Sequence, residues 1–192
     1  EIVRDGPARV GFGPTVGYLL EPNGSLSFDR HSLEMTLIFA EAGHEVGSLF
    51  YTHFNMTDSR FQLDREFIKQ GLARNEDEYH TATGRELALL WHAPYYFTSS
   101  EIVAASRESN YTYVSQDLDS LDWVSMDPGK AAPDIYFPAA RLVERIVSQK
   151  KPGSIVPIRV GKPAGEREDY LFQKLDLLID ALLRLGYAVV PV

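Results

Sequence analysis

A histidine near the end of a predicted strand is the first residue whose position suggests chemistry. The stretch AEAGHEVGSLFYTHFNMT, residues 40–57, is typical of a helix end, a glycine, a short strand and a loop, and His53 falls where the strand should end. The carboxyl ends of strands form the open face of an α/β sheet, where ligands bind. His53 is therefore a candidate metal ligand or catalyst. A single histidine cannot hold a metal ion, however. Leu49, which precedes His53 in the same predicted strand and loop, has an apolar side chain and cannot be a second ligand.

Composition limits the classes of protein to which the chain can belong. Its 192 residues fit one domain, and 44% hydrophobic and 24% charged residues are ordinary values for a globular protein. The formal net charge of -8 argues against a nucleic-acid partner, which would require a basic face. No apolar run reaches the length of a membrane span. Cysteine is absent, which excludes disulfides, cysteine metal ligands and cysteine nucleophiles.

Predicted strands and helices alternate along most of the chain, which indicates an α/β fold with a parallel sheet and a site at the strand ends. Residues 1–28 are rich in glycine and proline and predict short strands, at 9–12 and 15–20, broken by turns. Asp29 or Ser32 can cap the next helix, which Gly43 ends. Further helices are predicted from Thr57, from Ser100 to near Asn110, at 141–150 and at 167–186, and further strands at 44–50, 87–96, 111–115, 153–160 and 187–192.

From Glu41 to the C-terminus, the order of motifs resembles the polysaccharide deacetylase family, the NodB homology domain of carbohydrate esterase family 4. The resemblance rests on EAGHEVGS, on TGRELALLWHAPYYFTSSEIVAASRESNYTYVSQDLDSLDW and on KPGSIVPIRV with the helix and strand that follow, and it covers about three quarters of the chain. It implies a distorted (β/α) barrel of about seven strands. Residues 1–192 would then form a single domain whose N-terminal part is atypical or truncated.

The resemblance also implies a chemistry. Members of the family use a divalent metal, usually zinc, that is held by one aspartate and two histidines. The metal lowers the pKa of its bound water, and this water attacks an acetyl group on a polymer of amino sugars. A second aspartate acts as the general base, and a histidine late in the chain acts as the general acid.

Two of the motifs would supply the metal ligands and the base. In the second motif, His53 matches the second ligand histidine, and Leu49 stands in the position of the first. The stretch IVRDGP at Ile2–Pro7 is similar to the first motif, in which case Asp5 matches the ligand aspartate and Arg4 stands in the place of the base. His53 and Asp5 are therefore the candidate relics of a metal site.

Two further motifs carry substitutions at positions that serve catalysis. His92 stands where the family has an arginine that orients the base, and histidine is shorter and titrates near neutral pH. Arg159 stands where the family has the general acid, and a guanidinium cannot release its proton at working pH. Tyr95 matches the residue whose backbone amide helps to form the oxyanion hole, and Ile158 matches the residue that receives the acetyl methyl group.

The fourth motif, DSLDW, is intact and contains Asp119, Asp122 and Trp123. In the family, the aspartate before the tryptophan orients the catalytic histidine, and the tryptophan lines the groove. Because Arg159 replaces that histidine here, we predict that it forms an ion pair with Asp122, or with Asp119. Trp123 and Tyr95 would then form an aromatic floor on which a sugar can stack.

We therefore predict a catalytically impaired member of the family, a carbohydrate-binding or structural module with a polysaccharide or glycan partner and no cofactor. Loss of a general acid or base alone costs about 10²- to 10⁴-fold in rate. The alternative is an active deacetylase with a rearranged ligand set, such as His53 and His92 with an aspartate, that binds zinc or another divalent metal. The resemblance implies an extracytoplasmic location, whether secreted, periplasmic or on the cell surface, and the sequence does not determine the oligomeric state.

Overall fold

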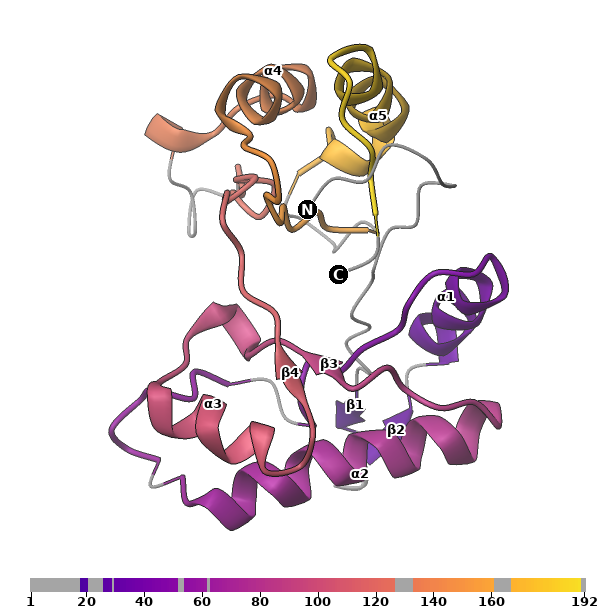
Figure 1. Cartoon of the computed structure of the whole chain (residues 1–192), viewed down its shortest axis with the longest axis vertical. Coiled ribbons are helices and arrows are strands. Elements are labelled where there is room, and N and C mark those ends of the chain that lie inside the picture. The colour runs from indigo at the N-terminus through magenta and orange to yellow at the C-terminus, as the bar shows by residue number, and fades with distance from the viewer. Residues whose placement is uncertain are drawn as a thin grey trace. The chain divides into compact units, whose positions relative to one another are not determined.

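The computed structural model describes residues 18–20, 26–28, 30–51, 54–61, 63–126, 133–160 and 167–190. The chain divides into two compact units. Unit 1 comprises Glu1–Ala8 and Gln116–Val190, and unit 2 comprises Arg9–Ser115 and Pro191–Val192. In Figure 1 the helices of unit 2 run from indigo to magenta and those of unit 1 from orange to yellow. The prediction of a single domain over residues 1–192 stays a prediction.

Short parallel strands lie at the centre of unit 2. Strand β3 (Leu90–Trp91) pairs in parallel with β4 (Thr112–Tyr113), and Ser48 forms a parallel bridge to Trp91. The Ser48 amide donates to the Leu90 carbonyl at 2.8 Å, and the His92 amide donates to the Ser48 carbonyl at 3.0 Å. The predicted parallel arrangement of the segments at 44–50, 87–96 and 111–115 is therefore confirmed.

The beginning of unit 2 contains a hairpin and a helix. Strand β1 (Tyr18–Leu20) pairs antiparallel with β2 (Leu26–Phe28), whereas the strand predicted at 9–12 lies outside the described residues. Helix α1 (Arg30–Glu41) is followed by Gly43 with φ of 84°, a left-handed conformation that favours glycine. The helix end predicted from this glycine is confirmed.

Helix α2 (Arg65–Thr83) begins later than the predicted Thr57. The Asp64 carboxylate caps it by accepting from the Phe67 amide at 2.7 Å, and Gly84 ends it with φ of 68°. Thr57 instead donates its amide to the Asn55 side chain at 2.9 Å, which stabilises a turn. The buried positions of α2 recur at helical spacing: Ile68, Leu72, Asn75 and Tyr79.

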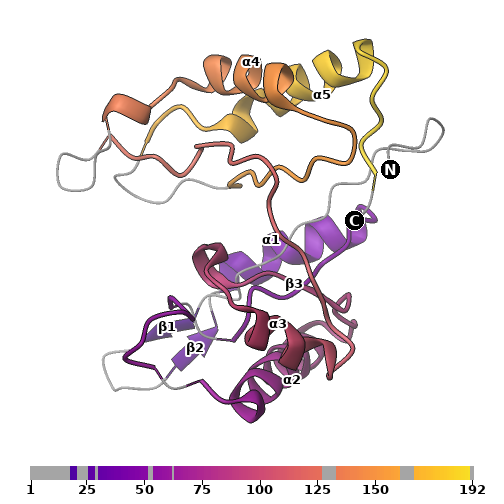
Figure 2. The ribbon, with the colours of Figure 1, turned by 60° about the vertical axis from the view of Figure 1, so that its left-hand side comes forward.

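Helix α3 (Ser100–Arg107) lies beside α2 in Figures 1 and 2 and closes the core of unit 2. Its cap is Ser99, one residue before the predicted Ser100, because the Ser99 hydroxyl accepts from the Ile102 amide at 3.4 Å. The core of unit 2 comprises Phe50, Met56, Ile68, Leu72, Trp91, Ala93, Ile102, Ala105 and Tyr111.

Unit 1 is built mainly from helices. Helix α4 (Ala139–Gln149) packs against α5 (Leu175–Arg184), and a 3₁₀ turn, η3 (Leu171–Lys174), leads into α5 (Figure 2). A further 3₁₀ turn, η2, spans Pro133–Ile135. The buried side chains between these elements are Leu142, Ile146, Leu171 and Leu178.

The strands predicted at 153–160 and 187–192 are not present as strands in residues 153–160 and 187–190. A reason is visible at Ile155, whose amide donates to the Asp117 carboxylate at 2.9 Å while its carbonyl accepts from the Asp117 amide at 3.0 Å. Pro157, which follows, has no amide to donate to a strand ladder.

The strands among the described residues form two two-stranded sheets, and no closed barrel is present in that part of the chain. The number of about seven strands stays a prediction. None of the helices in the described ranges is both long enough and apolar enough to cross a membrane.

Candidate functional site

The residues predicted to form the site are distributed over both units and over undescribed segments. His53 and Asp5, the candidate metal ligands, lie outside the described residues. Unit 2 contains Leu49, His92 and Tyr95, whereas unit 1 contains Asp119, Asp122, Trp123, Ile158 and Arg159.

Leu49 is a buried side chain, with 7% of its surface exposed. An apolar side chain offers no lone pair, so this position cannot contribute a metal ligand. Burial stabilises the folded chain by about 1.5–3 kcal/mol for a leucine, which gives Leu49 a packing role in unit 2.

A buried polar group holds the turn that follows Leu49. Phe50 has φ of 70°, which is rare for a bulky residue, and its amide donates to the Ser48 hydroxyl oxygen at 3.0 Å. Asn75 of α2, itself only 2% exposed, donates to the same oxygen at 2.8 Å and lies 3.5 Å from the Phe50 carbonyl. No sequence motif indicates Ser48 or Asn75, because a single polar residue gives no signal of what it contacts.

The Phe50 ring also explains a glycine in α2. A Cβ atom at Gly71 would lie 2.2 Å from Cζ of Phe50, so any larger residue would displace the ring. The ring is close to those of Phe67 and Trp91, with centroid separations of 5.9 and 6.3 Å. The turn that leads toward residues 52–53 is therefore fixed by hydrogen bonds and by packing.

His92 is positioned by an aromatic neighbour. Its ring stacks on that of Tyr96 with a centroid separation of 4.7 Å and an interplanar angle of 10°, and Nδ1 lies 3.2 Å from the Ala93 carbonyl oxygen. The ring is half-buried. A stacked imidazole in this position lacks the reach and the permanent charge of the arginine found in the family.

Tyr95 is presented on a strained turn, the 3₁₀ element η1 (Pro94–Tyr96). Both Tyr95 and Tyr96 have positive φ, 57° and 60°, which is uncommon for residues other than glycine, asparagine or aspartate. The Tyr95 side chain is 57% exposed. This exposure is compatible with the predicted binding role.

In unit 1, Asp119 orients Trp123. Both carboxylate oxygens of Asp119 lie 3.1 Å from the indole Nε1, which donates to them. The Leu121 amide donates to Oδ1 of Asp119 at 2.9 Å, and this bond supports the positive φ of 60° at Leu121. The Trp123 side chain is 47% exposed, so its ring is held by one edge and remains accessible to a ligand.

Asp122 is buried and interacts with the interior of unit 1. Its Oδ1 accepts from the Leu171 amide at 2.9 Å and lies 3.8 Å from Nη1 of Arg167, and both charged side chains are 1% exposed. Burial raises the pKa of the Asp122 carboxyl above its ordinary value of 3.8, whereas the Leu171 amide and the Arg167 and Arg159 charges lower it to a smaller extent.

Arg167 is the residue that the sequence analysis missed in this site. Its guanidinium donates to the backbone carbonyls of Asp122 and Phe137, at 3.3 and 2.7 Å, and its Nε donates to the Asp169 carbonyl at 2.9 Å. The guanidinium carbon also lies 4.6 Å from the centroid of the Tyr136 ring. The charge is therefore compensated by carbonyl oxygens, a carboxylate and an aromatic face.

The structure gives Asp122 a buried charged neighbour that the motifs did not indicate. The buried guanidinium beside this carboxylate belongs to Arg167, whereas the side chain of Arg159 is exposed. The backbone amide and the charge of Arg159 both lower the pKa of Asp122, and the predicted ion pair of Arg159 with Asp122 or Asp119 stays a prediction. Ile158, the predicted acetyl-methyl contact, is half-buried and packs against the core of unit 1.

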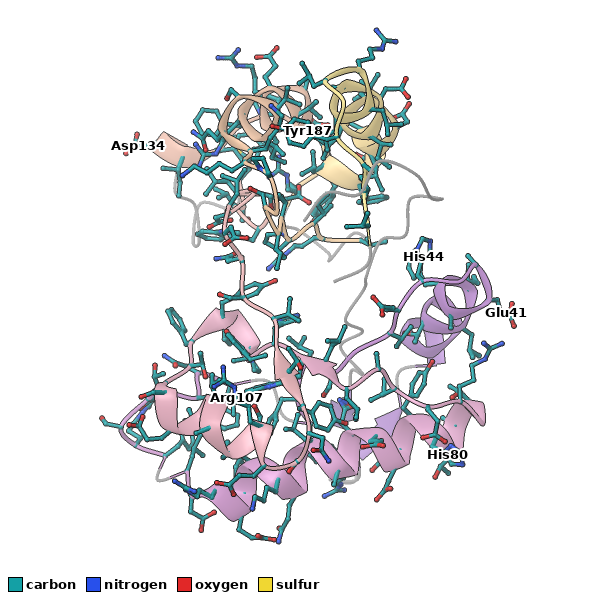
Figure 3. All side chains as sticks on the ribbon, in the orientation of Figure 1. Glu41, His44, His80, Arg107, Asp134 and Tyr187 are labelled. Atoms are coloured by element: carbon teal, nitrogen blue, oxygen red, sulfur yellow. The ribbon has the colours of Figure 1, made fainter. Side chains whose placement is uncertain are left out.

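His80 and His44, which match no ligand position of the family motifs, have structural contacts. His80, labelled in Figure 3 near the end of α2, lies with Nδ1 2.9 Å from Glu86 Oε1, and the ring of His44 packs edge-on against Phe39 at 5.8 Å. Within the described residues, no three histidine, aspartate or glutamate side chains are grouped so that they could hold a metal ion. This observation does not test Asp5 or His53.

Comparison with known proteins identifies relatives in sequence and in fold. No family model matches the chain. A chitooligosaccharide deacetylase from Bradyrhizobium sp. (strain ANU 289) is 24% identical over 157 residues, which cover 78% of this chain and 65% of the relative. The chain therefore spans less than two thirds of that protein's length.

Two solved structures illustrate the similarity in fold. A family 4 carbohydrate esterase pseudoenzyme from Bacillus anthracis has a TM-score of 0.60 at 21% identity, covering 82% of this chain and 50% of the other. A family 4 acetyl xylan esterase from Clostridium thermocellum, solved with a cobalt ion, has a TM-score of 0.64 at 16% identity, covering 85% and 69%.

These comparisons show a protein with the fold of the carbohydrate esterase family 4 enzymes. They confirm the resemblance to the polysaccharide deacetylases that the motifs indicated, and the similar structures include both enzymes and pseudoenzymes.

Proposed function

We propose that the chain is a catalytically impaired polysaccharide deacetylase-like module that binds a glycan. The observation that carries this proposal is the state of the fourth motif, in which Asp122 is buried against Arg167 and Leu171 while Trp123 stays exposed. The groups associated with proton transfer have structural contacts, whereas an aromatic ring suited to a sugar is accessible.

The case for impaired chemistry rests on charge and burial. In related enzymes the carboxylate at the position of Asp122 would orient a catalytic histidine, but here Arg159 stands in place of that histidine. Asp119 is bound to the Trp123 indole and the Leu121 amide, and Leu49 is buried and apolar. An arginine does not exchange protons at neutral pH, so the chain lacks a general acid at this position.

The alternative is an active metal-dependent deacetylase with a rearranged ligand set that includes His53 and His92. The acetyl xylan esterase of similar fold, which was solved with a cobalt ion, supports this alternative. If the chain is active, zinc or another divalent ion would polarise the acetyl carbonyl and activate water. The described residues place His92 against Tyr96, where its ring has a structural contact.

We also propose a class of glycan partner and an extracytoplasmic compartment. Acetylated amino-sugar polymers are the expected partner, because the curated relative is a chitooligosaccharide deacetylase. An extracytoplasmic location follows from the same resemblance, and so does a barrel of about seven strands.

Binding is tested by calorimetric titration of the chain with N-acetylglucosamine oligomers. We expect binding by the wild type and a loss of about tenfold or more in affinity for Trp123→Ala, because a tryptophan face is a large contact. Met126→Ala is the matched control, since Met126 is an exposed side chain of the same unit. Equal affinities for wild type, Trp123→Ala and Met126→Ala would contradict the binding role of Trp123.

Activity is tested by a time course of acetate release from the same oligomers and from acetylated xylan, with and without zinc or cobalt. We expect no release above background. Metal-dependent release that is abolished by Asp122→Asn or His92→Ala would overturn the proposal and establish the alternative.

A further inference from the structure

Helix α5 presents an apolar stripe to solvent beside the positions that it buries in unit 1. Leu177, Ala181 and Leu185 follow one another at four-residue spacing, so they lie on one face of the helix. Leu177 and Leu185 are 50% and 54% exposed, whereas Leu178 is buried in the core. A single exposed leucine needs no explanation, but two in line on one helix face form apolar surface that a partner can cover.

This stripe borders a groove of about 340 Å³ between α4 and α5, which lie side by side (Figures 1 and 2). Its lining includes four apolar side chains and two of opposite charge: Val147 of α4, and Leu177, Asp180, Ala181, Arg184 and Leu185. All of these residues belong to unit 1, so the groove is formed within one unit.

The two charged side chains of the groove are exposed and form no ion pair within the described part of the chain. Asp180 and Arg184 are four residues apart on α5, the spacing at which Arg74 and Glu78 of α2 do form an ion pair, at 3.5 Å. Both signs of charge in the groove are therefore available to a partner molecule.

The mixed charges limit the kind of partner. A strongly acidic or strongly basic partner would meet one like charge for every opposite one, and a helix that binds an anionic membrane carries a polar face rich in lysine and arginine. A surface that carries one acidic and one basic group beside an apolar stripe is complementary to a second surface of the same kind. An isologous dimer pairs a surface with itself in this way.

The spacing of the residues fits a two-fold axis near the middle of the stripe. Ala181 lies midway between Leu177 and Leu185, each about 6 Å away along the helix. Two antiparallel copies of α5 that cross at Ala181 would bring Leu177 of one copy to Leu185 of the other, and the small alanine would let the helices approach closely. The midpoint of Asp180 and Arg184 falls one residue from Ala181, so each carboxylate would lie within reach of the other copy's guanidinium.

We propose that the groove between α4 and α5 binds a second copy of this chain, in an antiparallel dimer in which α5 packs on α5 about Ala181. This inference goes beyond the proposed glycan binding and does not depend on it. One pair of helices buries less area than a standard-size interface, so we expect a reversible dimer with a dissociation constant in the micromolar range.

The first test is sedimentation velocity of the chain over a range of concentrations that spans the micromolar region. We expect a monomer–dimer equilibrium that Leu177→Gln weakens by about tenfold or more, because an isologous interface loses each contact twice. Leu185→Gln is a second variant with the same expected effect. Leu183→Gln is the matched control, since Leu183 is 49% exposed on the same helix and does not line the groove.

The second test exchanges the charges. We expect Asp180→Arg and Arg184→Asp to weaken the dimer by about threefold or more each, because like charges then face each other, and the double variant to regain the affinity of the wild type. Asp176→Arg is the control, since Asp176 is an exposed aspartate of α5 outside the groove.

The outcomes decide the proposal. A wild type that stays monomeric at its highest soluble concentration would overturn it and leave the groove to another segment or protein. A dimer that Leu177→Gln and Leu185→Gln weaken no more than Leu183→Gln does would show that the copies associate through a different surface. A double charge variant no tighter than the two single variants would exclude the antiparallel arrangement.

Discussion

Among the described turns that hold a bulky residue at positive φ, the one at Phe50 in unit 2 and the one at Leu121 in unit 1 are stabilised by different chemistry. In unit 2 the turn at Phe50 is held by the neutral hydroxyl of Ser48 and the neutral amide of Asn75. In unit 1 the turn at Leu121 is held by the Asp119 carboxylate and is followed by the buried pair of Asp122 and Arg167. The first turn is held by neutral groups alone, whereas the second is followed by a buried charged pair that requires charge compensation.

The two turns also differ in the exposure of the side chains that they position. Phe50 is buried, and its ring occupies the space that a side chain at Gly71 would need. The turn at Leu121 leads directly to an exposed tryptophan. A charged group thus stabilises the turn that leads to an exposed ring, and neutral groups stabilise the turn that closes a core.

The largest expected effect is the removal of Arg167. The change Arg167→Met leaves the buried Asp122 carboxylate without its charge partner and several carbonyl oxygens without their donor, and we expect a loss of about 3–5 kcal/mol in the free energy of unfolding. Urea denaturation measures this change. Arg159→Met is the control, and it should stay within about 0.5 kcal/mol because the side chain is exposed. Equal losses for the two variants would restore Arg159 as the main partner of Asp122.

A smaller effect is expected at the neutral turn. Asn75→Ala removes the amide that donates to Ser48, and we expect a loss of about 1–3 kcal/mol. Gln70→Ala is the matched control, because Gln70 is an exposed amide of the same helix. A loss for Asn75→Ala no greater than that of the control would show that packing of the Phe50 ring alone holds the turn.

The smallest effect concerns pH. Since burial raises the pKa of Asp122, the folded chain favours the protonated carboxyl, and ionisation costs stability as the pH rises above 3.8. The free energy of unfolding of the wild type should therefore fall with rising pH relative to that of Asp122→Asn. Urea denaturation of both chains across the acidic range measures the difference. A wild type that gains stability relative to the variant over that range would mean that the Arg167 charge outweighs burial.

The same comparison indicates how much could be predicted from the sequence. The C-terminal end of α1 and the parallel relation of β3 and β4 were predicted because they depend on local signals, a glycine and alternating elements. The start of α2 was predicted too early because threonine is a favourable helix cap. In the structure the Thr57 amide instead donates to the Asn55 side chain and forms a turn. Residues 153–160 have the apolar composition of a strand. The Ile155 amide, however, donates to the carboxylate of Asp117, 38 positions away in the chain, so it is not available to a neighbouring strand.

The candidate site was predicted in part for the same reason. The residue types of the fourth motif indicated Asp119, Asp122 and Trp123, and the structure gives each of them a defined contact. Arg167 could not be predicted, because it lies in a charged stretch that resembles an exposed helix surface. Its burial depends on carbonyl oxygens of distant segments, which no sequence pattern records.

The sequence by itself determined the helix end at Gly43, the motifs that resemble a deacetylase and the substitutions at Leu49 and Arg159 that argue against its chemistry. These features follow from residue types and spacing. The tertiary structure decided which arginine compensates Asp122, which rings are exposed and which turns are strained. The physical reason is that burial, desolvation and hydrogen-bond partners are set by residues far apart in the chain, and they arise only when the segments pack.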